Sequence, residues 1–396
     1  MFEGRHRDRQ VRPRVLRGER NWWFLGPGGV AKLYSSHISS DGGPSAEAAE
    51  WLRAQGMYRK AERKAYSLTV LTTTHCNLGC SYCFQNLAQD ESGGTAPPRI
   101  SFARLSFETI RKILEFARHR MTKAGLSRLH ITLFGGEPLL NPRGCEELLE
   151  TARPLGLRSA DMVSNGTLLS GVTVRRLQDL GLRSIQITFD GDQPDHDASR
   201  VKRTGGGTFD AIVSNIREVQ DVTDVPFGFR INVTKQNVPG IEQLIDRLAA
   251  RLNAGRCGIY FKIVGDVGNG FRNDLAASDQ LIQKFIGWNR QALAHGFRVG
   301  RPRERVPCPA CSFPGGTYGA VVNADGTLFS CWETAGKPGL QVGTVVDGYL
   351  PEEVISSRWT TCEEDYQNFA DLDAWERFHD TVDAALLDDL AAMGRL

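Results

Sequence analysis

The chain has little net charge and no long hydrophobic run, and both absences limit what it can be. Its 48 Lys and Arg residues nearly balance 46 Asp and Glu residues, which leaves a formal charge of +2. Composition therefore gives no electrostatic reason to expect a nucleic acid as partner. No apolar run is long enough to span a membrane, so no membrane is expected either. The first residues are polar and Arg-rich, unlike a signal peptide, which predicts a cytoplasmic protein.

Cysteine is scarce, with 9 in 396 residues, but all except Cys145 and Cys257 fall in two groups. Cytoplasmic thiols stay reduced, so grouped cysteines indicate metal ligands ahead of disulfides. Cys76, Cys80 and Cys83 have the spacing C-x3-C-x2-C. Three thiolates from one tight loop can each ligate an iron of a cubane cluster, and the fourth iron stays open to another molecule. Zinc or buried thiols are the alternative, although zinc sites favour paired C-x2-C arms.

Residues 66–265 alternate strand and helix signals, which predicts an α/β fold with a parallel sheet. Strands are expected at 67–72, 130–134, 161–164, 184–189, 227–234 and 258–264. Amphipathic helices are expected at 107–117, capped by Ser106, and at 172–180, 209–219 and 241–252. We interpret this pattern as a six-fold βα repeat that forms a partial TIM-like barrel, with its chemistry at the C-terminal ends of the strands. The loop of the first three cysteines directly follows the first strand.

The cysteine spacing, with the aromatic Tyr82 just before Cys83, resembles the signature of the radical S-adenosylmethionine (radical SAM) enzymes. The resemblance implies an open (β/α)6 barrel, SAM as a cofactor, and a SAM-binding [4Fe-4S] cluster held by Cys76, Cys80 and Cys83. In this family the reduced cluster cleaves SAM to a 5′-deoxyadenosyl radical that abstracts hydrogen from the substrate. An external one-electron reductant such as flavodoxin or ferredoxin is the implied partner, and Tyr82 would lie near the adenine.

The second strand ends in Gly135-Gly136-Glu137, which resembles the Gly-Gly-Glu motif of the family. Two glycines let the backbone pass close to a ligand, and Glu137 can accept hydrogen bonds from the SAM ammonium group. The alternative is a plain turn between strand and helix. After the third strand, Ser164 and Asn165 offer hydroxyl and amide groups for SAM, or cap a loop without a ligand.

Two charged residues complete the first candidate site. Asp190 follows the fourth strand, where it either lines the active-site pocket or caps a turn. Arg200 precedes a glycine-rich loop and a helix start, and this setting suits a carboxylate of SAM or of a substrate.

The second cysteine group lies beyond residue 300. Cys308 and Cys311 form a C-x2-C arm, and a hairpin around Asp325-Gly326 is expected to present Cys331 near that arm. Cys362 can complete a set of four. Four thiolates can ligate one auxiliary [4Fe-4S] cluster, with zinc as the alternative metal.

The run from Cys311 through Gly326 to Cys331 resembles the SPASM or twitch extension of radical SAM enzymes. The domains are then an N-terminal extension at 1–65, a radical SAM barrel at 66–298, and a SPASM/twitch-like domain with a hairpin and helices at 299–396. The extension, with an expected hairpin at 22–34 and a helix at 46–52, is either a packing extension or a partial leader-peptide-binding element.

This resemblance implies hydrogen abstraction from a side chain of a ribosomal peptide or protein, which gives an oxidative crosslink or a related modification. The expected partner is a peptide substrate, with or without a leader segment. The alternative is a twitch-type dehydrogenase or epimerase that acts on a small molecule. Sulfatase-maturing enzymes carry Asp directly after the cysteine that matches Cys331, whereas this chain has Trp332, so that activity is disfavoured.

Overall fold

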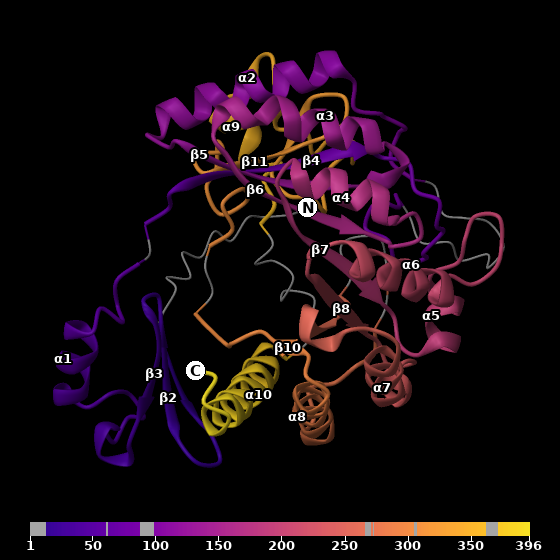
Figure 1. Ribbon diagram of the computed structural model, residues 1–396. Helices are drawn as coiled ribbons and strands as arrows, with labels where there is room; N and C mark the ends of the chain where they lie inside the picture. Colours follow the sequence, from indigo (N-terminus) through magenta and orange to yellow (C-terminus); the bar gives the residue numbers. More distant parts are fainter. Residues whose placement is uncertain are drawn as a thin grey trace.

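The computed structural model describes residues 13–60, 62–87, 99–265, 271, 273–304, 307–361 and 371–396. A large sheet runs through the molecule (Figure 1), with the strand order β10-β9-β8-β7-β6-β5-β4-β11-β12-β13-β14. Its parallel strands are β4 (Ala65–Thr73), β5 (Arg128–Gly135), β6 (Leu157–Ser164), β7 (Leu182–Phe189), β8 (Phe227–Val233) and β9 (Cys257–Ile263), joined by the short β10 (Arg298–Val299). The predicted strands and their parallel order are confirmed, and the fold is α/β with a partial barrel.

Helices cover the outer face of this sheet (Figure 1). They are α2 (Phe107–Lys123), α3 (Pro142–Ala152), α4 (Gly171–Asp179), α5 (Gln193–Ser199), α6 (Phe209–Val222), α7 (Ile241–Arg251) and α8 (Asp279–Ala294). The four predicted helices are present, and the side chain of Ser106 caps α2 as expected. The helices α3, α5 and α8 were not predicted. Short 3-10 helices occupy Ser35–His37, Pro138–Leu140, Arg153–Leu155, Val238–Gly240 and Ala254–Arg256.

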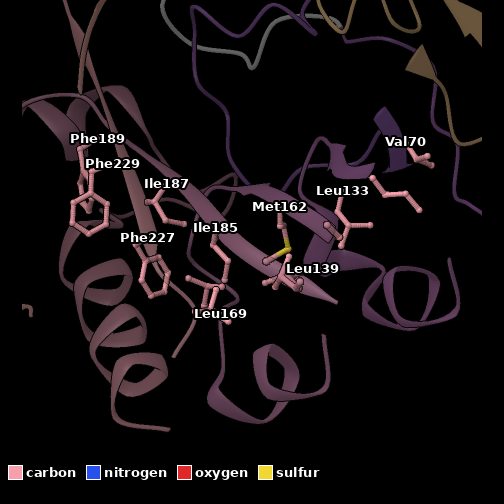
Figure 2. Close-up of a cluster of buried hydrophobic side chains, with 14 of the residues drawn as sticks. Val70, Leu133, Leu139, Met162, Leu169, Ile185, Ile187, Phe189, Phe227 and Phe229 are labelled. Carbon is pink, nitrogen blue, oxygen red and sulfur yellow. The ribbon is translucent and has the colours of Figure 1, made fainter. Parts of the chain in front are cut away.

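The main core lies between the sheet and these helices, and Figure 2 shows part of it. Along β7, Ile185, Ile187 and Phe189 are fully buried, whereas Gln186 and Thr188 between them are partly exposed. Successive side chains of a strand point to opposite faces, so the apolar set meets the helices and the polar set faces the inside of the barrel. The inner face is therefore available for a polar site.

The predicted C-terminal hairpin is also present, as the antiparallel pair β11 (Gly319–Val322) and β12 (Thr327–Phe329). Strand β11 pairs in parallel with β4, so the hairpin extends the barrel sheet at the strand that leads into the first cysteine loop. The chain continues through β13 (Gly343–Thr344), β14 (Gly348–Tyr349) and α9 (Glu352–Ile355). The loops that carry the first cysteine group and Cys331 therefore follow strands of the same sheet.

The N-terminal region forms a separate antiparallel sheet of β1 (Arg14–Arg17), β2 (Trp22–Gly26) and β3 (Gly29–Leu33), followed by α1 (Ala46–Ala54). The predicted hairpin and helix are confirmed, whereas β1 was not predicted. The long helix α10 (Leu372–Ala392) contacts this sheet and α8 (Figure 1). None of the helices in the described ranges combines the length and apolar character that crossing a membrane requires.

Candidate active site

A cavity of 540 Å³ lies at the C-terminal ends of the parallel strands. Its walls come from the first cysteine loop, the strand ends, the inner faces of β7 to β9, the segment after β12, and α10. The predicted site residues that line it are Cys76, Cys80, Cys83, Tyr82, Gly135, Gly136, Ser164, Asn165 and Arg200. Glu137 and Asp190 are not among the lining residues. The structure thus brings most of the candidate residues to one cavity.

Cys76 and Cys80 are buried, and Cys83 is partly exposed. Burial raises the pKa of Cys80 to about 12 and also raises the pKa of Cys76, so these thiols hold their protons when no metal is bound. Hydrogen-bond donors already face the sulfurs: Leu78 N lies 3.4 Å from Cys76 Sγ, and Arg99 Nη1 lies 3.6 Å from Cys83 Sγ. A bound metal deprotonates a coordinating thiol, and such donors then stabilise the thiolate. The donor set fits an iron-sulfur cluster.

Close packing against the backbone explains why residues 135 and 136 are glycines. A Cβ atom on Gly135 would lie 2.2 Å from the carbonyl oxygen of Thr73, and one on Gly136 would lie 2.2 Å from that of His75. Gly135 also has φ +138, a conformation that favours glycine. The end of β5 is therefore pressed against the backbone that enters the cysteine loop. The sequence predicted that these glycines let the backbone approach a ligand. In the structure they let it approach another segment of the chain, which is a different physical reason.

Glu137 is fully buried and joins the ends of β5 and β6. Its carboxylate accepts hydrogen bonds from Asn165 N at 2.7 Å, Ser164 Oγ at 3.0 Å and Leu139 N at 3.0 Å. Burial raises the pKa of Glu137 although these donors favour the charged form. Ser164 and Asn165 line the cavity, and their hydrogen bonds to Glu137 fix their positions. Its predicted contact with the SAM ammonium group stays a prediction.

Asn165 in turn reaches the cysteine loop. Its side-chain Nδ2 lies 2.9 Å from Asn77 Oδ1 and 3.7 Å from Cys76 Sγ, and its Oδ1 accepts a hydrogen bond from Thr167 N. The end of β6 is thereby connected to the first cysteine, although 89 positions separate the two residues.

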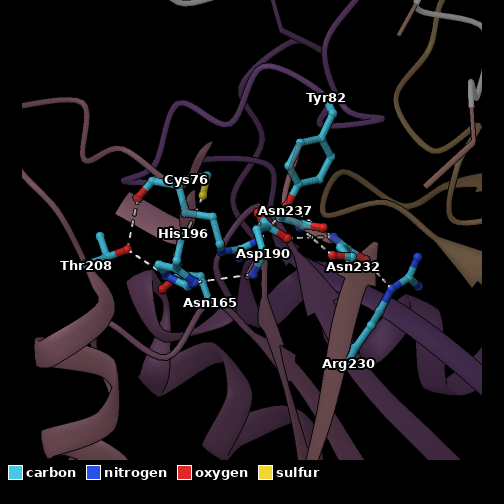
Figure 3. A network of polar contacts seen from close by, with 10 residues as sticks. Cys76, Tyr82, Asn165, Asp190, His196, Thr208, Arg230, Asn232 and Asn237 are labelled. Atoms are coloured by element: carbon cyan, nitrogen blue, oxygen red, sulfur yellow. Dashed lines mark hydrogen bonds and ion pairs between the residues drawn. The ribbon is translucent and has the colours of Figure 1, made fainter. Parts of the chain in front are cut away.

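A polar network lies beside the cavity, centred on Tyr82 and Asp190 (Figure 3). The Tyr82 hydroxyl donates to Asp190 Oδ2 at 2.5 Å and accepts from Arg200 Nη1 at 2.9 Å. Asn232 Nδ2 donates to Asp190 Oδ1 at 3.0 Å. Burial, and then the charge of Asp190, hold the pKa of Tyr82 well above its usual value, so the phenol stays protonated. Asp190 is thus engaged by its neighbours, and the predicted proximity of Tyr82 to adenine stays a prediction.

Arg200 links this network to the cavity. Burial opposes its charge, yet Tyr82, Cys80 and Asp190 together hold the pKa of Arg200 well above its usual value. Its Nε atom is buried and has no hydrogen-bond partner in the described structure. Such an unsatisfied donor in a cavity wall fits an anionic ligand group, as expected for a carboxylate.

In the second cysteine group, the structure brings Cys311 and Cys331 together. A hydrogen bond between the Cys331 thiol and the neighbouring Cys311 sulfur, followed by burial, raises the pKa of Cys331 well above its usual value. Cys308 packs against the apolar cluster around this hairpin, whereas Cys362 lies outside the described residues. The indole of Trp359 donates to the carbonyl of Cys311 at 2.7 Å and fixes the arm.

An aromatic row that sequence reasoning missed connects the two cysteine groups. Phe84 follows Cys83 and stacks on Phe134, with centroids 6.0 Å apart. Trp332 follows Cys331 and also stacks on Phe134, with centroids 5.6 Å apart. All three rings line the cavity, and Trp332 is 39% exposed there. The row forms one aromatic wall of the cavity.

A further part of the cavity wall was also missed by sequence reasoning. It carries Arg230 and Tyr260 from the inner faces of β8 and β9, together with Phe378, Val382 and Leu386 from α10. The alternation of Arg230 and Asn232 along one strand face was the available signal for the barrel residues. No local motif marks the residues of α10, because only the tertiary fold brings that helix to the cavity.

A partial parallel barrel with three cysteines at the strand ends defines the class: a barrel enzyme whose cavity can hold a thiol-ligated group. Residues 70–248 match the model of the Radical SAM superfamily. The chain is a radical SAM enzyme, a class whose cofactors are SAM and a [4Fe-4S] cluster.

The curated relatives differ in their chemistry. The chain is 25% identical over 228 residues to the Fe-coproporphyrin III synthase of Methanosarcina barkeri, covering 57% of this chain and 52% of the synthase. It is 26% identical over 339 residues to the GTP 3′,8-cyclase of Synechococcus sp., covering 77% and 90% of the two chains. It is 28% identical over 189 residues to the sporulation killing factor maturation protein SkfB of Bacillus subtilis, covering 48% and 40%.

Among solved structures, anSMEcpe with bound AdoMet and Cp18Cys peptide has a TM-score of 0.61. The match has 16% sequence identity and covers 83% of this chain and 99% of that one. This similarity concerns the fold, and it extends well beyond residues 70–248.

Proposed function

We propose that this radical SAM enzyme abstracts hydrogen from a side chain of a ribosomal peptide or protein and leaves an oxidative crosslink or a related modification. The observation that carries the proposal is the shared cavity, in which Trp332, directly after Cys331, faces the same space as Cys80. A substrate held there would contact both cysteine regions. SkfB, a maturation protein, and anSMEcpe, solved with a peptide, support a peptide as the substrate.

The cysteines and the cavity wall suit the required cofactors. Cys76, Cys80 and Cys83 would hold the cluster, which when bound supplies the electron that cleaves SAM to the 5′-deoxyadenosyl radical. Gly135, Gly136, Ser164 and Asn165 would contact SAM, with Tyr82 near the adenine and Glu137 at the ammonium group. Arg200 would pair with a carboxylate of SAM or of the substrate, and Asp190 would hold Tyr82 and Arg200 in place.

We also propose that Cys308, Cys311, Cys331 and Cys362 hold one auxiliary [4Fe-4S] cluster, which would accept an electron during a net oxidation. Cys311 and Cys331 are buried beside one another, which supports their binding to one shared metal cluster. The N-terminal sheet remains our candidate for a leader-peptide-binding element, with an external reductant as the second partner.

The second candidate is a reaction on a small molecule, which the extended match to a GTP 3′,8-cyclase favours. Anaerobic protein reconstituted with iron and sulfide is incubated with SAM, a reductant, and either a short peptide encoded next to the gene or GTP. A peptide-dependent rise in 5′-deoxyadenosine, with loss of hydrogen mass from the peptide, supports the first proposal. A product from GTP and none from the peptide would overturn it.

Cysteine variants separate the two metal sites. We expect Cys80→Ala to abolish cleavage of SAM, and Cys311→Ala to retain some cleavage but to impair formation of the modified product. An iron content of about eight atoms per chain would support two clusters, and a content of about four atoms would support only one. Zinc in place of iron at the second site would contradict the auxiliary cluster.

A further inference from the structure

A second and smaller hollow lies against the first cysteine loop. Its volume is 220 Å³, and its lining residues are Thr74, His75, Arg99, Ile100, Phe102 and Arg203. None of these residues lines the larger cavity. Thr74 and His75 directly precede Cys76, so the segment that enters the cysteine loop forms part of the surface of this hollow.

Two arginines of the hollow contact the cysteine loop directly. Arg99 Nη1 lies 3.6 Å from Cys83 Sγ, and Arg203 Nε donates to the carbonyl oxygen of Cys76 at 3.1 Å. The described lining residues include no acidic side chain. The described lining therefore carries two positive charges, and its arginines contact two of the cysteines that would hold the SAM-binding cluster.

Phe102 gives the hollow an apolar contact point. Its side chain is 72% exposed, and its ring lies edge-on to His75 with centroids 6.1 Å apart. A large exposed aromatic side chain flanked by arginines is typical of the contact residues of protein interfaces. The feature is unlike a substrate pocket, because the hollow is small and shares no lining residue with the larger cavity.

We propose that this hollow docks the small acidic electron-carrier protein that reduces the cluster. Carboxylates of the carrier would pair with Arg99 and Arg203, and an apolar side chain would pack on Phe102. In the transfer, one electron leaves the reduced carrier and enters the oxidised cluster, so no bond forms or breaks and no proton has to move. The proposal rests on the radical SAM cluster and is independent of which substrate the enzyme modifies.

The test changes the charge at Phe102 and leaves the cysteine loop untouched. Phe102→Glu and Phe102→Lys both remove the exposed ring, but only the first repels an acidic carrier. Arg217→Glu, at an exposed position of α6, is the control for a general change of charge. Reduced flavodoxin is the probe, and its dissociation constant is measured at low and high salt with the reconstituted enzyme.

We expect Phe102→Glu to weaken flavodoxin binding about tenfold at low salt, with a smaller difference at high salt. The Phe102→Lys variant should bind more tightly than Phe102→Glu, because it loses the ring but attracts the acidic carrier, and Arg217→Glu should bind close to the parent. Formation of 5′-deoxyadenosine from SAM alone should fall in Phe102→Glu when flavodoxin is the donor, and should stay at the parent rate when dithionite is the donor. The dithionite reaction needs no docking, and this assay contains no peptide substrate.

Equal binding of flavodoxin to the parent and to Phe102→Glu would overturn the proposal. A matching loss with dithionite would also overturn it, because the substitution would then act on the cluster itself. If Phe102→Glu weakens binding of an acidic substrate peptide and not of flavodoxin, the hollow is a peptide site and the assignment is wrong.

Discussion

At the residue scale, the site depends on hydrogen bonds between polar side chains in and beneath the cavity wall. Tyr82 and Asp190 are 108 positions apart, yet their hydrogen bond is among the shortest in the site. Sequence reasoning selected each residue separately, one from a motif and the other from a strand end. It could not predict that they bond to each other, because no local pattern relates a loop residue to the end of a distant strand.

Tyr82→Phe should destabilise the fold through this network. The substitution removes the hydroxyl that donates to Asp190 and accepts from Arg200, which leaves two buried charged groups with fewer partners. We expect the free energy of unfolding to fall by about 1–3 kcal/mol, measured by urea denaturation. Tyr260→Phe is the control, because its hydroxyl bonds to Gln186 in a more exposed setting. Equal losses in both variants would contradict the role of the network.

His196 predicts how stability depends on pH. Burial, and then Arg200, hold the pKa of His196 well below its usual value, and the imidazole is placed between Asp190 N and Thr208 Oγ1. Below about pH 6.5 the unfolded chain gains a proton on this histidine that the folded chain does not, so stability falls as pH falls. His196→Gln should reduce this slope, which is at most about 1.4 kcal/mol per pH unit for one proton. Urea denaturation at pH 5.5 and 7.5 measures it, and an unchanged slope would refute the assignment.

At the element scale, the repeat of strands and helices could be predicted because each strand and each helix has its own periodicity of apolar residues. Ser106 with its apolar stripe predicted α2, and the turn at Asp325-Gly326 predicted the β11–β12 hairpin. The parallel pairing of β11 with β4 was not predictable, since Gly319 and Ser67 meet only through the tertiary fold. The aromatic row could not be predicted for the same reason, because its rings come from three separate segments of the chain.

The contact between the end of β5 and the cysteine loop leads to a prediction about a glycine. In Gly136→Ala the new Cβ would overlap the carbonyl oxygen of His75, so the strand and the loop must move apart. We expect a loss of more than about 2 kcal/mol in unfolding free energy, together with reduced iron incorporation at the first site. Gly228→Ala on β8 is the matched control, because nothing lies within 4 Å of its Cβ position. Normal iron content in Gly136→Ala would contradict this reasoning.

At the scale of the whole molecule, α10 connects the N-terminal sheet to the active-site cavity. Asp388 is 2% exposed and accepts hydrogen bonds from Arg20 N, Asn21 Nδ2 and Trp23 Nε1. Another part of the same helix contributes Phe378 to the cavity wall. The contact between Trp23 and Asp388 spans 365 positions, which explains why the sequence alone did not reveal it.

Asp388→Ala should therefore loosen two regions at once. Three donors lose their buried acceptor, and we expect a loss of about 3 kcal/mol or more in unfolding free energy. Asp380→Ala removes a more exposed ion pair with Arg14, also between α10 and the N-terminal sheet, and should cost less than about 1 kcal/mol. Proteolysis of the N-terminal sheet should accelerate in Asp388→Ala alone. Equal rates in the two variants would show that the buried carboxylate is not the anchor.

The pairing of β11 with β4 has a consequence for dissecting the protein. A fragment cut before residue 300 would lose β11 and expose the hydrogen-bonding groups along one side of β4. Uncovered strand edges of this kind template association with other chains. The cysteine-bearing C-terminal part is thus no detachable module, and a shortened barrel is expected to aggregate before its chemistry can be assayed.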